Sequence, residues 1–282
     1  MKHKVVLICL GALVAQGIFA SVIYEEAFYI DGTVRTEGLE LHGSGVGSTS
    51  SGTGIGASGY SWSVAATDGF VTRYTVPGAG TTGDGGMYYS QLSGAYSYAT
   101  VNFSNFTGYD SYTLTAEANG LDCSPLRMGF GVDTAGSFSG ESGDALYIQT
   151  LGGGVLNATV DVSLVYRHNG TTTVLETKSG VDTVNAANDT LTLLYDQVNN
   201  TLSAVFIDGA TSTTSTFGTY VLGFTPTLST VKYEIENEGS FGNSNFPRWE
   251  STSLNAVPEP SSVALMGVAV AALAVRRWTR SV

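Results

Sequence analysis

The sequence has few of the residues that usually build covalent cross-links, metal sites or catalytic dyads. Its 282 residues include 2 cysteines and 3 histidines, and only 13% of the residues are charged. Because Cys9 lies in an N-terminal apolar run, a mature chain keeps Cys123 alone, which excludes an internal disulfide and a cysteine metal site. A Gly-x-Ser-x-Gly nucleophile elbow and a Gly-x-x-x-x-Gly-Lys phosphate loop are both missing. We therefore expect no cofactor, and a body held together by its core alone.

The charge balance disfavours another class of function. Lys and Arg number 12 against 24 Asp and Glu, which gives a formal net charge of −12. An acidic surface repels phosphate backbones, so we expect no nucleic-acid partner. Cations and neutral glycans remain compatible with such a surface. Gly, Ser, Thr, Asn and aromatic residues are plentiful instead, which is typical of exported β-proteins with many turns.

Residues 1–20 have the order of a secretory signal peptide. Lys2 and Lys4 form a basic start, residues 5–14 are apolar, and Ala20 is a small residue at the expected cleavage point. We therefore predict a signal helix that is removed after Ala20, with cleavage after Gly17 as the alternative, and we exclude it from the fold.

The last residues of the chain, 257–282, form a second membrane-directed segment. A proline-bracketed glutamate is followed by a short apolar run and a basic end. These parts are Val257, Pro258, Glu259 and Pro260, then residues 261–275, then Arg276, Arg277 and Arg280. A helix of about fifteen residues spans some 22 Å, less than the roughly 30 Å hydrocarbon core. We predict a short transmembrane helix suited to transient insertion, with the arginines as the membrane stop on the cytoplasmic side.

This order of parts, combined with an N-terminal signal, resembles the PEP-CTERM sorting domain. The resemblance covers the tail, 257–282, and nothing of the body, 21–256. It implies that an exosortase, a membrane-embedded transpeptidase, recognises the tail and cuts near the Pro-Glu-Pro motif. It also implies export by a Gram-negative bacterium, a transient inner-membrane anchor, and a final place at the cell surface or in the extracellular matrix. Extracellular polysaccharide is then a candidate partner, and a plain tail anchor is the alternative.

Alternation of apolar and polar residues, interrupted by turn residues, recurs along the body. The expected strands are 21–28, 69–75, 87–92, 95–103, 111–118, 126–132, 144–151, 158–167, 172–177, 189–195, 201–207, 230–238 and a last one near Trp249. No segment has a convincing 3.6-residue period. We predict one all-β domain, a two-sheet antiparallel jelly-roll-like sandwich with less than about a tenth helix.

Two hairpins are the clearest local predictions. His168-Asn169-Gly170 is a hairpin-turn signal. The strands at 189–195 and 201–207 should pair with their apolar residues on one face. Those residues are Leu191, Leu193, Tyr195, Leu202, Ala204 and Phe206.

Part of the body resembles the concanavalin A-like jelly roll of legume-lectin, laminin-G-like and pentraxin domains. The resemblance lies in a strand that ends in Met128-Gly129-Phe130-Gly131 and in the later hairpin that closes at Asp208-Gly209. It covers residues 110–240 at most, and it implies a lectin-like fold.

Three carboxylates, Glu234, Glu236 and Glu238, alternate along the expected strand 230–238 and would share one face. Laminarinase-type glycoside hydrolases on the same jelly roll use a Glu-x-Asp-x-Glu triad, and this resemblance makes Glu234 and Glu238 the catalytic pair of an alternative function. The middle residue here is Glu236, and the strand lies near the end of the body. We therefore expect no catalytic residue, and a solvated outer face of an edge strand instead.

Calcium ligands could come from loops around the 189–207 hairpin. The candidates are Asp182, Asp189, Asp196, Asn199 and Asp208. Asp and Asn are also ordinary turn formers, so we predict no metal site.

We expect His42 and His168 in solvated loops. For the chain as a whole, we expect a non-enzymatic structural or glycan-binding surface protein.

Overall fold

The computed structural model describes residues 20–27, 29–30, 33–34, 60, 62–64, 70–73, 86–89, 96–103, 108–121, 125–133, 137–151, 159–182, 188–236 and 248–258. Both predicted terminal helices lie outside the described residues, as do His42, Cys123 and Glu238. Within the described part of the chain, no helix is long and apolar enough to cross a membrane.

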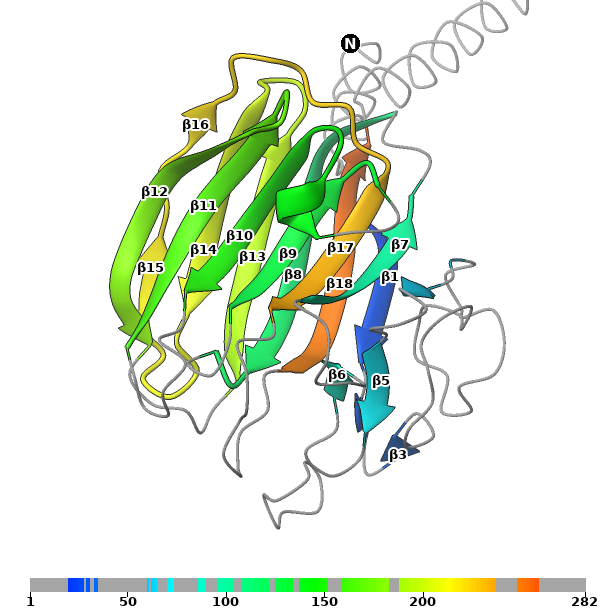
Figure 1. The fold of residues 1–282 in the computed structure, drawn as a ribbon, viewed down its shortest axis with the longest axis vertical. Coiled ribbons are helices and arrows are strands. Elements are labelled where there is room, and N and C mark those ends of the chain that lie inside the picture. The colour runs from blue at the N-terminus through cyan, green and yellow to red at the C-terminus, as the bar shows by residue number, and fades with distance from the viewer. Residues whose placement is uncertain are drawn as a thin grey trace, which may run out of the picture.

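Most of the described residues form strands, which are joined by turns, loops and one 3-10 helix (Figure 1). One set comprises β1 (Ser21–Ala27), β5 (Phe70–Arg73), β6 (Gly86–Tyr89), β8 (Tyr109–Asn119), β13 (Asp189–Asp196), β14 (Thr201–Ile207), β15 (Thr214–Thr216), β16 (Tyr220–Val221) and β18 (Arg248–Pro258). The other set comprises β4 (Trp62–Val64), β7 (Tyr96–Asn102), β9 (Leu126–Gly131), β10 (Ala145–Leu151), β11 (Val160–His168), β12 (Thr171–Asp182) and β17 (Thr230–Glu236). A separate ribbon pairs β2 (Tyr29–Ile30) with β3 (Thr33–Val34).

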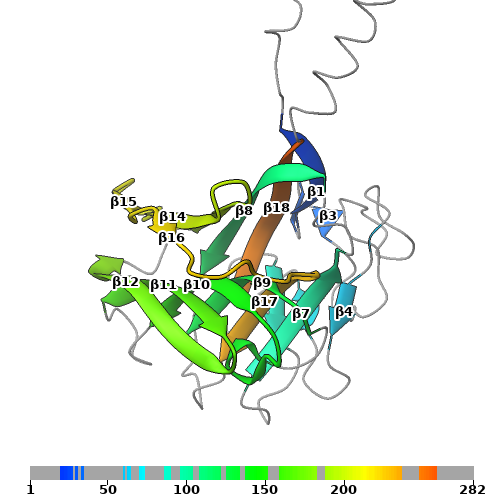
Figure 2. The ribbon, with the colours of Figure 1, turned by 90° about the horizontal axis from the view of Figure 1, so that it is seen from above.

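The two sets make two antiparallel sheets that lie face to face (Figure 2). The nine-stranded sheet has the order β15-β14-β13-β8-β18-β6-β5, with β1 also paired to β18 and β16 to β14. The seven-stranded sheet has the order β12-β11-β10-β9-β17-β7-β4. The prediction of two antiparallel sheets with almost no helix is confirmed, since the described residues contain one short 3-10 helix, η1 (Phe138–Gly140).

Both predicted hairpins are present. In the β13–β14 hairpin, Leu191 lies opposite Phe206, Leu193 opposite Ala204 and Tyr195 opposite Leu202, and all six side chains are buried. The β11–β12 turn has positive φ at Asn169 (50°) and Gly170 (76°), which a type I′ turn requires and which Asn and Gly tolerate best.

The core lies between the sheets, where alternate residues of the central strands meet. Phe130 and Tyr233 from one sheet pack with Leu114 and Trp249 from the other in a single hydrophobic cluster. The Tyr233 and Trp249 rings have centroids 5.5 Å apart in an edge-on arrangement. A buried polar contact ties the layers as well, because the Tyr24 and Tyr233 hydroxyls are 2.8 Å apart.

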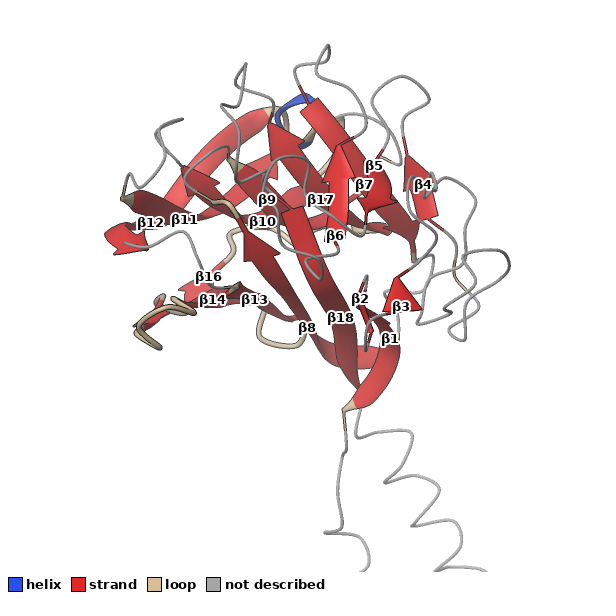
Figure 3. Ribbon diagram, turned by 90° about the horizontal axis from the view of Figure 1, so that it is seen from below, coloured by secondary structure: helices blue, strands red, loops and turns tan. Residues whose placement is uncertain are grey.

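β18 is longer than the sequence predicted and lies inside its sheet. It pairs with β8 as far as Pro258, opposite Tyr109, and with β1, where Ala256 lies opposite Ser21. Val257 and Pro258, the first residues of the predicted sorting motif, therefore belong to a central strand. Proline has no N–H to donate, so it suits the last position of the ladder. The start of β1 and the end of β18 lie side by side (Figure 3).

Candidate functional site

The acidic strand occupies a different position from the one predicted. β17 lies in the interior of the seven-stranded sheet, between β9 and β7, and is no edge strand. Its inner row faces the core, whereas Lys232, Glu234 and Glu236 form the outer row. Lys232 and Glu234 are nevertheless 0% exposed. The expectation of a solvated face is therefore wrong for Glu234.

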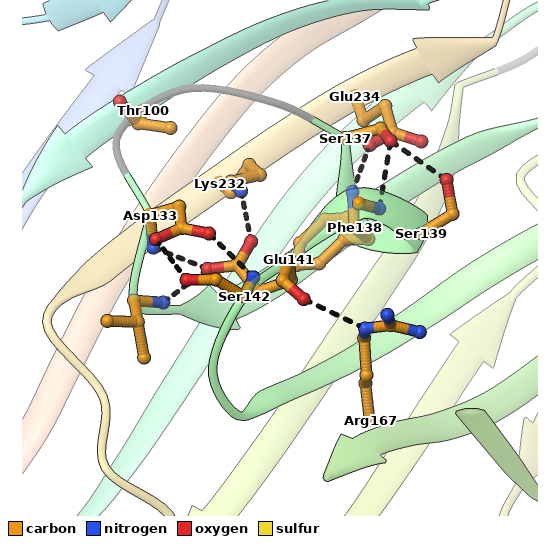
Figure 4. Close-up of polar contacts among 12 residues, drawn as sticks. Thr100, Asp133, Ser137, Phe138, Ser139, Glu141, Ser142, Arg167, Lys232 and Glu234 are labelled. Carbon is orange, nitrogen blue, oxygen red and sulfur yellow. Dashed lines mark hydrogen bonds and ion pairs between the residues drawn. The ribbon is translucent and has the colours of Figure 1, made fainter. Parts of the chain in front are cut away.

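Lys232 and Glu234 are buried because described residues between β9 and β10 lie over them. We call residues 132–133 and 137–144 the covering segment. Figure 4 shows Glu141 and Phe138 of this segment next to Lys232 and Glu234. The Phe138 ring stacks on Tyr147, with centroids 4.6 Å apart, and joins a small second hydrophobic cluster. A small group of apolar side chains thus covers this part of the outer face.

Glu234 is held from two directions. Its Oε1 forms an ion pair with Arg127, and its Oε2 accepts a hydrogen bond from the Phe138 N–H at 2.7 Å. Arg127 also pairs with Glu236, and its Nε donates to Gln149 Oε1 at 3.1 Å. One guanidinium therefore bridges two carboxylates on the outer row.

Burial sets the protonation behaviour of this bridge. It raises the pKa of Glu234 above the ordinary value, although the Arg127 guanidinium and the Phe138 N–H act in the opposite direction. Burial would lower the pKa of Arg127, but the Glu234 and Glu236 carboxylates outweigh it and raise that pKa. Arg127 therefore stays charged, and Glu234 favours its protonated form more than a solvated glutamate does.

A second buried ion pair lies beside the first. The Lys232 ammonium contacts the Glu141 carboxylate, and both side chains are 0% exposed. Lys232 Nζ also lies 5.3 Å from the centroid of the Phe138 ring. Glu141 Oε1 accepts hydrogen bonds from the Val132 N–H at 2.6 Å and from the Asp133 N–H. The carboxylate thus fixes the start of the covering segment and neutralises the lysine.

A glycine makes room for this carboxylate. A Cβ on Gly131 would lie 2.8 Å from Glu141 Oε1, closer than real Cβ atoms approach. The neighbouring Asp133 accepts hydrogen bonds from Ser142, through the N–H at 2.7 Å and the hydroxyl at 2.8 Å. Burial acts to raise the pKa of Asp133, but the Ser142 hydrogen bonds outweigh it and lower that pKa.

This arrangement gives the outer row little capacity for acid–base chemistry. A glycosidase needs two carboxyl groups that face a substrate across a cleft. Both oxygens of Glu234 are already bonded, and no part of its side chain is exposed. The described residues also hold no group of three or more His, Cys, Asp or Glu that could bind a metal ion.

The calcium candidates lie at opposite ends of the β13–β14 hairpin. At one end, Asp189 accepts a hydrogen bond from the Gly209 N–H at 2.9 Å, and Asp208 accepts one from the Ala210 N–H at 2.8 Å. At the other end, Asp196 accepts one from the Asn199 N–H at 2.9 Å. The structure does not bring these four described residues together, and they act as turn formers. Nothing is described of the Asp182 side chain.

His168 is more constrained than a solvated loop residue. Its ring stacks on Phe224 with centroids 3.8 Å apart, and its Nδ1 lies 2.6 Å from Asp144 Oδ1. Asp144 also accepts a hydrogen bond from the Thr227 N–H at 2.9 Å. The ring therefore ties the β11–β12 turn to the segment that precedes β17.

Sequence reasoning missed Arg127, Phe138 and Glu141. The only early signal was a single arginine among the apolar residues of β9, because a lone cation in a buried strand needs a partner. That partner, Glu234, is 107 residues away in the sequence.

Comparison with known proteins finds a match to the tail. Residues 256–277 match the PEP-CTERM protein-sorting motif. No curated protein matches the chain.

Several solved structures are similar to this one at low sequence identity. The Ca2+-bound VIP36 exoplasmic/lumenal domain is 12% identical, with 71% of this chain and 86% of that chain covered and a TM-score of 0.47. A Shewanella oneidensis MR-1 protein of unknown function is 9% identical, with 92% and 95% covered and a TM-score of 0.48. Peanut lectin with a 9mer peptide is 15% identical, with 66% and 90% covered and a TM-score of 0.43.

Proposed function

We propose that this chain is an exported protein whose tail an exosortase recognises and cuts, and whose β-sandwich then serves at the cell surface or in the matrix. The match of residues 256–277 to the PEP-CTERM protein-sorting motif carries this proposal. The residues assigned to recognition are Val257, Pro258, Glu259 and Pro260, and those assigned to the membrane stop are Arg276, Arg277 and Arg280. The secretory signal predicted at residues 1–20 supplies the route of export.

The sandwich has a non-catalytic role in this proposal. The sealed position of Glu234 supports it, because a nucleophile or general acid must reach the substrate. Glu234 is completely buried and spans the gap between Arg127 and the Phe138 N–H. A laminarinase-like reaction at Glu234 would require the covering segment to leave the sheet first.

A hydroxyl-rich surface on the nine-stranded sheet supports binding to extracellular polysaccharide, on a fold that we take to be a concanavalin A-like jelly roll. The outward residues of its central strands are mostly Ser and Thr. On β8, β13, β14 and β18 these are Ser111, Thr113, Thr115, Thr190, Thr192, Thr201, Ser203, Ser251 and Ser253, all half-buried. The Thr115 and Thr192 hydroxyls lie 3.3 Å apart across two strands. Glu117 and Asp196 are charged residues on the same outer face, and the hydroxyls around them can exchange hydrogen bonds with neutral sugars.

The sorting part is tested in a host that carries an exosortase. Replacing Pro258, Glu259 and Pro260 by alanine should leave the chain uncut and retained in the inner membrane. Fractionation with mass spectrometry of the C-terminus measures this outcome. Wild-type processing and release of the triple variant would refute the sorting assignment.

The sandwich part is tested on a glycan array, with and without calcium, beside a hydrolysis assay on mixed-linkage glucans. The double variant Thr115→Arg, Thr192→Arg should weaken binding about tenfold or more by replacing paired hydroxyls with bulky charges. Thr171→Arg, at an exposed position of β12 on the other sheet, is the control and should bind like wild type. Hydrolysis that disappears in Glu234→Gln would establish the enzyme instead.

A further inference from the structure

Six large apolar side chains are exposed among the described residues, and three of them, Val174, Leu151 and Leu194, lie on β12, β10 and β13. Among the described residues, the three most exposed large apolar side chains are Val221 (76%), Val198 (68%) and Val22 (62%). All three belong to the nine-stranded sheet or to its turns, and the pairing of the strands places all three at one end of it.

The register of the strands fixes this placement. Val221 lies opposite Thr201 of β14, which lies opposite Asp196 of β13, and that residue lies opposite Ser111 of β8. Ser111 lies opposite Val257 of β18, so a single row crosses the sheet from Val221 to the sorting motif. We call this end of the sheet the valine end.

The other two valines complete the same end. Val198 lies in the turn just beyond Asp196, and Val22 lies opposite Asn255, two residues before Val257. The valines do not form a continuous patch, because Thr201, Asp196 and Ser111 lie between Val221 and Val257, and single exposed apolar residues need no explanation by themselves. What these three valines share is the end of the sheet from which the tail leaves.

Both ends of the described sandwich leave from this place. Ser21 is the first residue of β1, and Ala256 lies opposite it on β18. Residues 259–282 follow Pro258 directly, and they contain the apolar run and the arginines. Because Pro258 is still paired with Tyr109, little free chain separates the folded body from the apolar run.

We propose that the valine end rests on the lipid headgroup surface while the tail is inserted in the membrane. This inference rests on the proposed sorting function and adds the orientation of the body. A short connection holds the valine end near the bilayer, where apolar side chains enter the headgroup boundary favourably. Three valines bury far less apolar surface than a transmembrane run, so the contact orients the sandwich and the tail anchors it. In this orientation the outer faces of the two sheets do not contact the membrane.

The test uses the mature chain, residues 21–282, reconstituted in phosphatidylethanolamine and phosphatidylcholine vesicles that carry nitroxide-labelled headgroups. Single cysteines are introduced as Val198→Cys and Val221→Cys in a Cys123→Ala background and labelled with a fluorophore. Thr213→Cys is the matched control, because Thr213 is exposed just beyond the opposite end of β14. That end lies about 20 Å along the strand.

We expect nitroxide quenching to be about threefold stronger at positions 198 and 221 than at position 213. Equal quenching at all three positions overturns the proposal, and so does a cross-linked dimer without quenching, which would assign the valine end to a second copy. A chain that does not float with the vesicles overturns the membrane-inserted tail of the proposed function, and this inference with it. If Cys123→Ala does not fold, hydrogen exchange of the unsubstituted chain should show vesicle-dependent protection at 197–200 and none at 209–213.

Discussion

The two faces of β17 are both buried, but in different ways. The inner residues Val231, Tyr233 and Ile235 pack against the opposing sheet within the main core. The outer residues Lys232 and Glu234 are covered by a single segment and are neutralised by ion pairs. Apolar burial on the inner face depends on many neighbours of the same kind. Burial on the outer face depends on particular partners, so the loss of one partner leaves a charge with a large desolvation cost.

The largest effect is expected where one buried charge loses its partner. Lys232→Met should lower the free energy of unfolding by about 3–5 kcal/mol, because it leaves the fully buried Glu141 carboxylate without its lysine. Urea denaturation followed by tryptophan fluorescence measures the change. The double variant Lys232→Met, Glu141→Gln should recover much of the loss. A single variant as stable as wild type would show that the outer face does not depend on paired charges.

A substitution on the inner face of β17 should lower the free energy of unfolding by somewhat less. Ile235→Ala removes a completely buried side chain from the main core and should cost about 2–4 kcal/mol through lost burial and a cavity. Its cost should not depend on salt or on Glu141. Strong coupling to Glu141→Gln in a double-mutant cycle would contradict the separation of the two faces.

A smaller effect tests the fit of the covering segment. Gly131→Ala forces the Glu141 carboxylate to move and should cost about 1–3 kcal/mol by thermal denaturation. Gly223→Ala is the matched control, since a Cβ there meets nothing within 4 Å. Equal melting temperatures for the two variants would indicate that the covering segment adapts freely.

The smallest expected effect is a change of stability with pH that depends on Glu234. Burial raises the pKa of Glu234 above 4.5, so the unfolded chain releases this proton at a lower pH than the folded chain does. The contribution of Glu234 to stability is then fully present below 4.5 and declines as the pH rises through the raised pKa. The stability advantage of wild type over Glu234→Gln should shrink over that interval. Denaturation series at several pH values measure it, and an advantage that grows with pH would contradict the raised pKa.

Local patterns in the sequence predicted the parts of the fold that depend on neighbours in the chain. The β13–β14 hairpin followed from alternation, and the Asn169-Gly170 turn followed from the φ angles these residues tolerate. β4, around Trp62, was missed because three residues are too few to show a period.

The outer face could not be predicted in the same way. A row of glutamates has the same pattern on a solvated edge strand as under a covering segment, and only the position of β17 in the sheet separates the two cases. That position depends on pairing with β7 and β9, which are more than 90 residues earlier in the chain. The length of β18 was also missed, since Leu254 and Ala256 alternate with small polar residues and form a weak pattern.

The central place of β18 has a consequence for the order in which the sheet can form. Ribosomes make β1 first among the strands and β18 last, yet Ser21 of β1 pairs with Ala256 of β18. Among the described strands, β1 has no partner in the nine-stranded sheet until β18 has emerged, and β8 has one unpaired edge. Pairings this distant in sequence are slow to form, and waiting strand edges promote aggregation. The nascent chain therefore has to be kept from misassociating until its final strand is available.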